Sequence, residues 1–170
     1  VKPGNLMLSR DGHVKILDLG LALLHPGHLP LGDNLTSITQ LMGTVDYMSP
    51  EQANNTHEVD FRADIYGLGA TLFALLTDRS PLGDRHQTLL RKLSVLANDS
   101  VPSVLEFRSE TPEELAKLVS RMLNRDPFLR PGSAADVAAA LEVFSSRDGL
   151  SQLVENYQRL VQANNSPAGT

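Results

Sequence analysis

The chain has 170 residues, of which 41% are hydrophobic and 21% are charged, and its formal net charge is -5. This composition is typical of a soluble globular domain, and the acidic balance provides no basic surface of the kind that nucleic acid or an anionic membrane attracts. The absence of cysteine excludes disulfides and thiolate metal sites.

The longest apolar run covers residues 67–76 and is shorter than the roughly 18 residues that a membrane-spanning helix needs. No charged segment followed by an apolar one opens the chain, so no signal peptide is visible. We therefore expect no membrane segment here, no nucleic-acid partner and a cytoplasmic location, with any membrane anchor lying outside these residues.

Two short apolar runs open the chain, "LML" at 6–8 and "VKIL" at 14–17. They flank "SRDGH", and an Asp-Gly pair between such runs is a strong hairpin signal. The sequence therefore predicts a β-hairpin over residues 6–17.

Residues 18–51 show no hydrophobic period and contain several prolines, glycines and hydroxyl side chains. A loop of this length in a compact domain is usually functional. We expect it to carry part of the site.

The residues that follow predict a helical body over 60–144. The segment "ADIYGLGATLFALLT" at 63–77 is apolar on nearly every side, which indicates a buried helix, and Gly67 and Gly69 within it indicate close packing. Residues 133–144 and 150–161 also have helical spacing, the latter ahead of a polar tail.

The segment 111–127 predicts an amphipathic helix with Thr111 as N-cap, Pro112 at the first helical position and Glu114 completing a capping box. Its apolar face is formed by Leu115, Leu118, Val119 and Met122. The fold class expected from all these elements is α+β, mainly α, with one hairpin before a helical body.

Asn5 and Asp18 stand beside the two predicted strands. The start of one hairpin strand lies near the end of the other, so the side-chain oxygens of Asn5 and Asp18 should face the same edge of the hairpin. Such a pair fits a hard cation such as Mg²⁺, which takes its other ligands from waters and phosphates. The alternative is that both residues only cap turns.

The five histidines include His25 and His28, which flank a Pro-Gly pair. They lack the further ligands that a zinc site needs, so we interpret this segment as a solvated loop.

Five short motifs follow one another in a recognisable order: "KPGN", "VKILDLG", "GTVDYMSPE", "DIYGLG" and "RDPFLRP". In order and spacing the chain resembles the C-terminal lobe of Ser/Thr protein kinases of the bacterial, eukaryotic-like type, from residue 1 to about 144. Residues 145–170 would form a C-terminal helix and a frayed tail.

The resemblance also implies what precedes Val1. The family's catalytic loop continues from His-Arg-Asp into the pattern that "VKPGN" matches, so the catalytic base would be the residue immediately before Val1. The N-terminal lobe, with its glycine-rich loop and ATP-contacting lysine, would also lie upstream. We therefore expect a kinase fragment that is inactive by itself.

The resemblance assigns catalytic roles to four residues. Asn5 and Asp18 would bind Mg²⁺, with Asp18-Leu19-Gly20 in the place of Asp-Phe-Gly. Lys2 would steady the transferred phosphoryl group of ATP, and Thr44 would link Lys2 to the catalytic Asp beside the substrate hydroxyl. A solvated surface lysine is the alternative for Lys2.

Other assignments are structural or regulatory. Glu51 would pair with Arg130, and Asp64 would accept backbone hydrogen bonds from the catalytic loop, because buried charges need partners. In the activation segment, 18–51, the hydroxyls of Thr36, Ser37 and Thr39 are possible phosphorylation sites or, alternatively, plain loop hydroxyls.

The function implied is transfer of the γ-phosphate of ATP to Ser or Thr hydroxyls of protein substrates, with Mg²⁺ as cofactor. A pseudokinase or scaffolding module on the same fold is the first alternative, and an independent helical interaction domain is the second. Joint retention of Lys2, Asn5, Asp18 and Thr44 favours the enzyme, because a scaffold does not need metal ligands.

Overall fold

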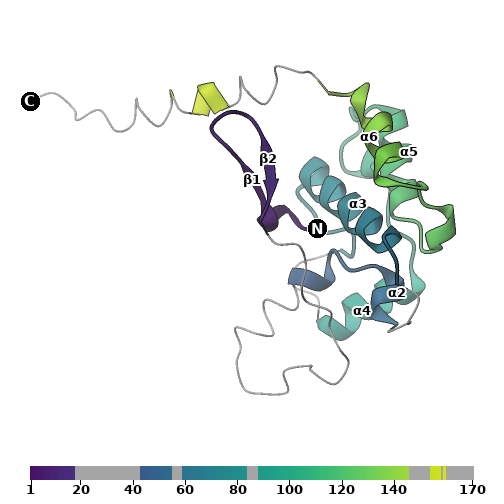
Figure 1. Cartoon of the computed structure of the whole chain (residues 1–170). Coiled ribbons are helices and arrows are strands. Elements are labelled where there is room, and N and C mark those ends of the chain that lie inside the picture. The colour runs from purple at the N-terminus through teal and green to yellow at the C-terminus, as the bar shows by residue number, and fades with distance from the viewer. Residues whose placement is uncertain (18–42, 55–58, 84–87, 146–153, 158, 160–170) are drawn as a thin grey trace, which may run out of the picture.

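The computed structural model describes residues 1–17, 43–54, 59–83, 88–145, 154–157 and 159. In chain order its elements are η1 (Pro3–Asn5), β1 (Leu6–Leu8), β2 (Val14–Ile16), α2 (Pro50–Ala53), α3 (Arg62–Thr77), α4 (Leu89–Asn98), η3 (Val104–Glu106), α5 (Glu113–Met122), η4 (Pro127–Leu129) and α6 (Ala134–Glu142) (Figure 1). The described part is mainly helical with one two-stranded sheet, as the sequence predicted.

The predicted hairpin is confirmed. β1 and β2 pair antiparallel with Leu6 opposite Ile16. At the turn, the hydroxyl of Ser9 donates to the carbonyl oxygen of His13 at 2.8 Å, and Gly12 adopts the left-handed region at φ 81°. Glycine tolerates this conformation because it has no Cβ, which explains the Asp-Gly signal.

Helix α3 is the centre of the fold, between the N-terminal segment and the helices α5 and α6 (Figure 1). Tyr66 and Phe73 are almost fully buried, in one cluster with Val104 and Val119. Burying a side chain such as Phe73 stabilises the fold by roughly 1.5–3 kcal/mol. On a different side of α3, Ile65 packs in a second cluster whose other buried members are Leu118, Met122 and Val137. The prediction of a buried helix is therefore confirmed.

The apolar face predicted for α5 is also confirmed, but the predicted N-cap is wrong. The helix begins at Glu113, and Pro112, with an extended backbone at ψ 132°, occupies the cap position. Thr111 therefore stands one residue too early to cap the first turn. Its Oγ1 is buried with no hydrogen-bond partner in the part of the chain that the structure describes.

The predicted helix at 133–144 is present as α6, and Ser133 caps it by accepting from the backbone N–H of Asp136 at 3.1 Å. Of the segment 150–161, residues 154–157 and 159 are described and are helical. The sequence did not single out α4, which Thr88 caps by accepting from the backbone N–H of Arg91. None of the helices in the described ranges is long and apolar enough to cross a bilayer.

Candidate active site

The N-terminal segment lies against the middle of α3. The hydroxyl of Thr71 is 3.2 Å from the carbonyl oxygen of Val1, and it also donates to the carbonyl oxygen of Gly67 at 2.8 Å. A Cβ added at Gly67 would lie 3.2 Å from the backbone nitrogen of Val1 and 3.3 Å from the carbonyl oxygen of Tyr47. The absence of a side chain at Gly67 therefore lets two distant segments approach the same helix.

Asn5 ends η1 beside the last residues of the hairpin. The backbone N–H of Leu17 donates to the carbonyl oxygen of Asn5 at 2.8 Å. Leu17 immediately precedes Asp18, so the chain enters the predicted Asp-Leu-Gly motif next to Asn5. Asp18, Leu19 and Gly20 lie outside the described residues.

Lys2 and Thr44 meet although 42 residues separate them. The Nζ atom of Lys2 is 3.4 Å from Oγ1 of Thr44, and both residues are half-buried. Thr44 opens a turn in which the backbone N–H of Tyr47 donates to the carbonyl oxygen of Thr44 at 3.1 Å. The turn fixes the threonine where the lysine reaches it.

The expected ion pair between Glu51 and Arg130 is present. Two nitrogens of the Arg130 guanidinium contact the two Glu51 carboxylate oxygens at 2.6 and 2.8 Å, a bidentate arrangement. Arg130 also donates to the carbonyl oxygens of Arg62 and Asn124, each at 2.8 Å, and its guanidinium lies 5.0 Å from the centre of the Tyr66 ring.

Burial and the Arg130 cation together set the protonation of Glu51 and Tyr66. Burial by itself would raise the pKa of Glu51, but the hydrogen bonds and positive charge of Arg130 outweigh it, so the pKa lies below its usual value. Burial raises the pKa of the Tyr66 phenol. Arg130 therefore faces an ionised carboxylate and a neutral phenol at neutral pH.

The expected contact between Asp64 and the catalytic loop stays a prediction, because only Val1–Asn5 of that loop are described. Asp64 is exposed in the first turn of α3, and Val1–Asn5 form no hydrogen bond with it. Val1, at the start of this segment, packs about one and two turns further along α3, at Gly67 and Thr71.

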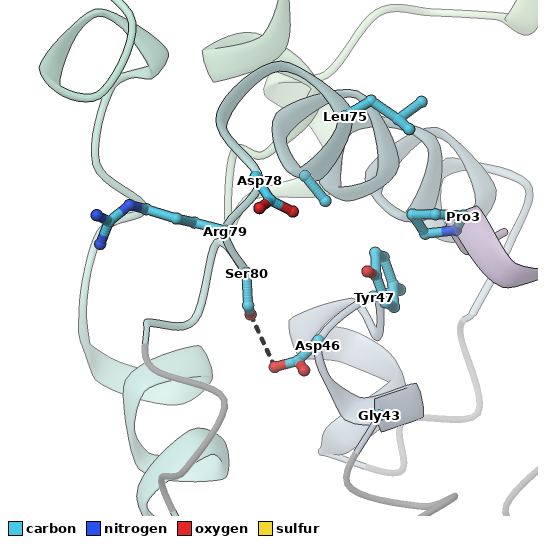
Figure 2. Close-up of a pocket in the computed structure, with 9 residues that line it drawn as sticks. Pro3, Gly43, Asp46, Tyr47, Leu75, Asp78, Arg79 and Ser80 are labelled. Atoms are coloured by element: carbon cyan, nitrogen blue, oxygen red, sulfur yellow. Dashed lines mark hydrogen bonds between the residues drawn. The ribbon is translucent and has the colours of Figure 1, made fainter.

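A pocket of about 390 Å³ lies between η1, the turn after Gly43 and the C-terminal end of α3 (Figure 2). Pro3 and Gly43, the neighbours in sequence of Lys2 and Thr44, both line it. The other lining residues are Asp46, Tyr47, Ala74, Leu75, Asp78, Arg79 and Ser80. The pocket therefore lies beside the place where the family resemblance locates the substrate hydroxyl.

Sequence reasoning did not identify a buried polar cluster next to this pocket. Lys92, on α4, contacts both carboxylate oxygens of Asp46 at 2.7 Å, and its side chain is 1% exposed. A lysine within a short amphipathic helix normally indicates a solvated side chain, so the sequence contained no signal for this pair.

Two groups of predicted residues cannot be placed. Thr36, Ser37 and Thr39 lie outside the described residues, and so do His25 and His28. Their assignments remain predictions from the sequence.

A comparison with protein families matches residues 1–142 to the protein kinase domain. The chain belongs to the protein kinase family. The match covers every element of the site described above, from Val1 to Arg130, so the contacts of Lys2, Thr44, Glu51 and Arg130 are contacts within a kinase domain.

Individual kinases show the same relationship. The chain is 35% identical over 84% of its length to a probable serine/threonine-protein kinase of Streptomyces coelicolor, and 34% identical over 83% to the serine/threonine-protein kinase PknB of Mycolicibacterium smegmatis. It is also 35% identical over 86% of its length to the tyrosine-protein kinase MasK of Myxococcus xanthus. The matches cover 20%, 22% and 21% of those proteins, so this kinase chain spans about a fifth of their length.

Proposed function

We propose that the protein to which this chain belongs transfers the γ-phosphate of ATP to Ser or Thr hydroxyls of proteins, and that these residues form the C-terminal lobe of its catalytic domain. The observation that carries the proposal is the 3.4 Å approach of the Lys2 ammonium to the Thr44 hydroxyl. It brings a cation and a hydroxyl from distant segments to one point beside the pocket, which is the arrangement that phosphoryl transfer by positioning and charge neutralisation needs.

Each residue has a proposed role. Lys2 places a positive charge next to the phosphoryl group in transit, and Thr44 orients Lys2 relative to the acceptor hydroxyl. Asn5 and Asp18 supply oxygen ligands of the kind that Mg²⁺ prefers, and the metal, when bound to ATP, neutralises phosphate charge. The hydrogen bond between Leu17 and Asn5 supports this, because it brings the chain next to Asn5 just before Asp18.

The proposed acceptor is Ser or Thr. The lysine two residues after the expected catalytic Asp marks the Ser/Thr kinases that the chain resembles, and Lys2 has that position. A tyrosine-protein kinase is among the similar proteins, so the assay should offer all three hydroxyl side chains.

The alternative is a pseudokinase that uses the same fold for binding alone. Fold does not decide between the two, because function depends on the site. The enzyme is favoured because Lys2 and Thr44 are brought into contact, which a binding scaffold does not need.

The test is phosphate transfer from labelled ATP to proteins rich in Ser, Thr or Tyr. We would assay the intact gene product, its Lys2→Met and Asp18→Ala variants, and the 170-residue chain by itself. Both substitutions should lower turnover by about a hundredfold or more. The isolated chain should transfer nothing, since the base and nucleotide-binding lobe expected upstream are needed to hold ATP in line.

The matched control is Lys15→Met, which removes an exposed lysine from β2. Turnover should change little in this variant. Intact protein with no transfer to any acceptor would contradict the enzyme and favour the pseudokinase, and transfer by the isolated chain would contradict the fragment assignment.

A further inference from the structure

Side chains from two other segments meet at one buried carboxylate, that of Asp46. Ser80 donates its hydroxyl to Oδ1 of Asp46 at 2.8 Å, and Lys92 contacts both carboxylate oxygens at 2.7 Å. The Lys92 side chain is 1% exposed and that of Asp46 is 9% exposed. We call Asp46, Ser80 and Lys92 the clamp.

The clamp joins parts of the fold that are distant in sequence. Asp46 belongs to the turn that follows Thr44, Ser80 belongs to the connection between α3 and α4, and Lys92 belongs to α4. Ser80 is itself fixed, because its hydroxyl accepts from the backbone N–H of Leu82 at 3.1 Å.

A buried ion pair is weak evidence for a role in stability. Removing two charges from water is costly, and apolar residues of similar volume often stabilise a fold as well or better. A buried ion pair that is present despite this cost fits a requirement for one particular geometry. Its hydrogen bonds are satisfied only when all three segments are in place.

The clamp also closes one part of the pocket wall. Asp46 and Ser80 both line the pocket, and Figure 2 shows the hydrogen bond between them joining the turn that carries Tyr47 to the chain that leaves α3. Pro3 lines the same pocket on the side of the catalytic loop. The distance between two of the pocket walls therefore depends on this bond.

Movement of Asp46 would be transmitted to the pocket through the next residue, Tyr47. The backbone N–H of Tyr47 donates to the carbonyl oxygen of Thr44, and that of Met48 donates to the carbonyl oxygen of Val45, each at 3.1 Å. These bonds leave Asp46 and Tyr47 little freedom, so the clamp also holds Tyr47, which lines the pocket.

We propose that Asp46, Ser80 and Lys92 are positioning residues that shape this pocket for the segment of the protein substrate next to the acceptor hydroxyl. The inference rests on the proposed kinase function, and it names the residues that control affinity for the protein substrate. Losing the clamp should weaken binding of the protein substrate and leave ATP binding unchanged, because none of the three side chains belongs to the proposed metal or phosphate ligands.

The test compares two variants of the intact protein. Ser80→Ala removes the bond between the two pocket walls and the bond from the Leu82 N–H, and it leaves the ion pair of Asp46 and Lys92 in place. The double variant Asp46→Leu with Lys92→Met replaces the ion pair by apolar side chains of similar size, which should keep the fold stable. Lys117→Met is the control, since Lys117 is exposed on α5 and pairs there with Glu113 and Glu114.

In both clamp variants the KM for a protein substrate should rise by roughly tenfold or more, as expected for a small misplacement of a substrate-positioning group. The KM for ATP and kcat should stay within about twofold of the wild type, and thermal unfolding should show that each variant is folded. The control Lys117→Met should leave both KM values, kcat and thermal unfolding unchanged.

Hydrogen exchange provides a readout that does not depend on turnover. Backbone amides of residues 44–48 should exchange faster in Ser80→Ala, and those of α5 should not change.

Unchanged amide exchange at residues 44–48 in Ser80→Ala would show that the clamp does not hold this turn. An unchanged KM for the protein substrate in a folded, active double variant would overturn its role in substrate affinity, and so would a parallel loss of kcat and of affinity for both substrates. If the wild type transfers no phosphate, the proposed kinase function is wrong, and so is the proposed role of the clamp in substrate affinity. The hydrogen-exchange result would still decide whether the clamp holds the turn.

Discussion

Gly69 on α3 lies directly against Met122 on α5: a Cβ built on the glycine would be only 2.7 Å from the Cβ of the methionine. Real Cβ atoms do not approach so closely, so the two helix backbones are in contact at this point. The glycine allows the close packing that its place in an apolar helix predicted.

We predict that Gly69→Ala destabilises the domain by about 1–3 kcal/mol, because overpacking outweighs the gain in helix propensity. Chemical denaturation of the chain would measure the change. Gly4→Ala is the matched control, since a Cβ there meets no atom within 4 Å. Equal stability of the two variants would contradict the close contact between α3 and α5.

The second prediction concerns the bidentate pair of Glu51 and Arg130. Either Glu51→Gln or Arg130→Met should cost on the order of 3–5 kcal/mol of unfolding free energy. The first leaves the Arg130 guanidinium, whose side chain is 0% exposed, without its anion, and the second removes the cation that faces the Glu51 carboxylate, whose side chain is 12% exposed. The control is Lys117→Met, whose exposed ion pairs should contribute no more than about 1 kcal/mol. A loss below that value in both variants would mean that the pair is not needed for the fold.

The third prediction is the pH dependence of that pair. The pKa of Glu51 is lower in the folded chain than its usual value of 4.5, so the stabilisation is complete above that pH and is lost as the pH falls through the lower folded value. The stability difference between wild type and Glu51→Gln should therefore shrink below about pH 4.5. Unfolding free energies between pH 7 and pH 3 would test this, and a constant difference would argue against an ionised Glu51.

The fourth prediction concerns the hydroxyls between Asp18 and the turn at Thr44. Phosphorylation within residues 36–39 should activate the intact protein, because added negative charge can pair with the arginine expected before the catalytic Asp. Changing Thr36, Ser37 and Thr39 together to Ala should then lower turnover by about tenfold or more. Changing the exposed serines 94, 100 and 109 to Ala is the control, and full turnover of the first variant would refute the prediction.

The fifth prediction follows from the exposed apolar side chains of the hairpin. Val14, Ile16 and Leu17 are 54%, 50% and 59% exposed, and Met7 and Leu8 lie on the same hairpin with 44% and 42%. Exposed apolar side chains favour association, so the isolated 170-residue chain should self-associate. Val14→Thr with Ile16→Thr should shift it toward monomer in sedimentation experiments, whereas Leu90→Thr on α4 should not. A monomeric wild-type chain at high concentration would count against this prediction.

Local sequence patterns were sufficient for the elements whose stability depends on near neighbours. The hairpin is set by the Asp-Gly turn and by apolar runs a few residues away, and α3 is set by an unbroken apolar segment. The pairing of Glu51 with Arg130 was also predictable, but only because the motifs around both residues resemble those of a known family.

Other features depended on tertiary contacts that no local pattern encodes. The sequence around Lys92 predicts a surface lysine. Its side chain is buried because the fold brings Asp46, 46 residues earlier in the chain, to its ammonium group. Thr111 fails to cap α5 because the helix begins only after Pro112, which occupies the cap position. The sequence by itself determined the hairpin and the helices α3, α5 and α6, since those depend on spacing along the chain. Only the tertiary structure decided which charges are buried together, since that depends on how the helices pack.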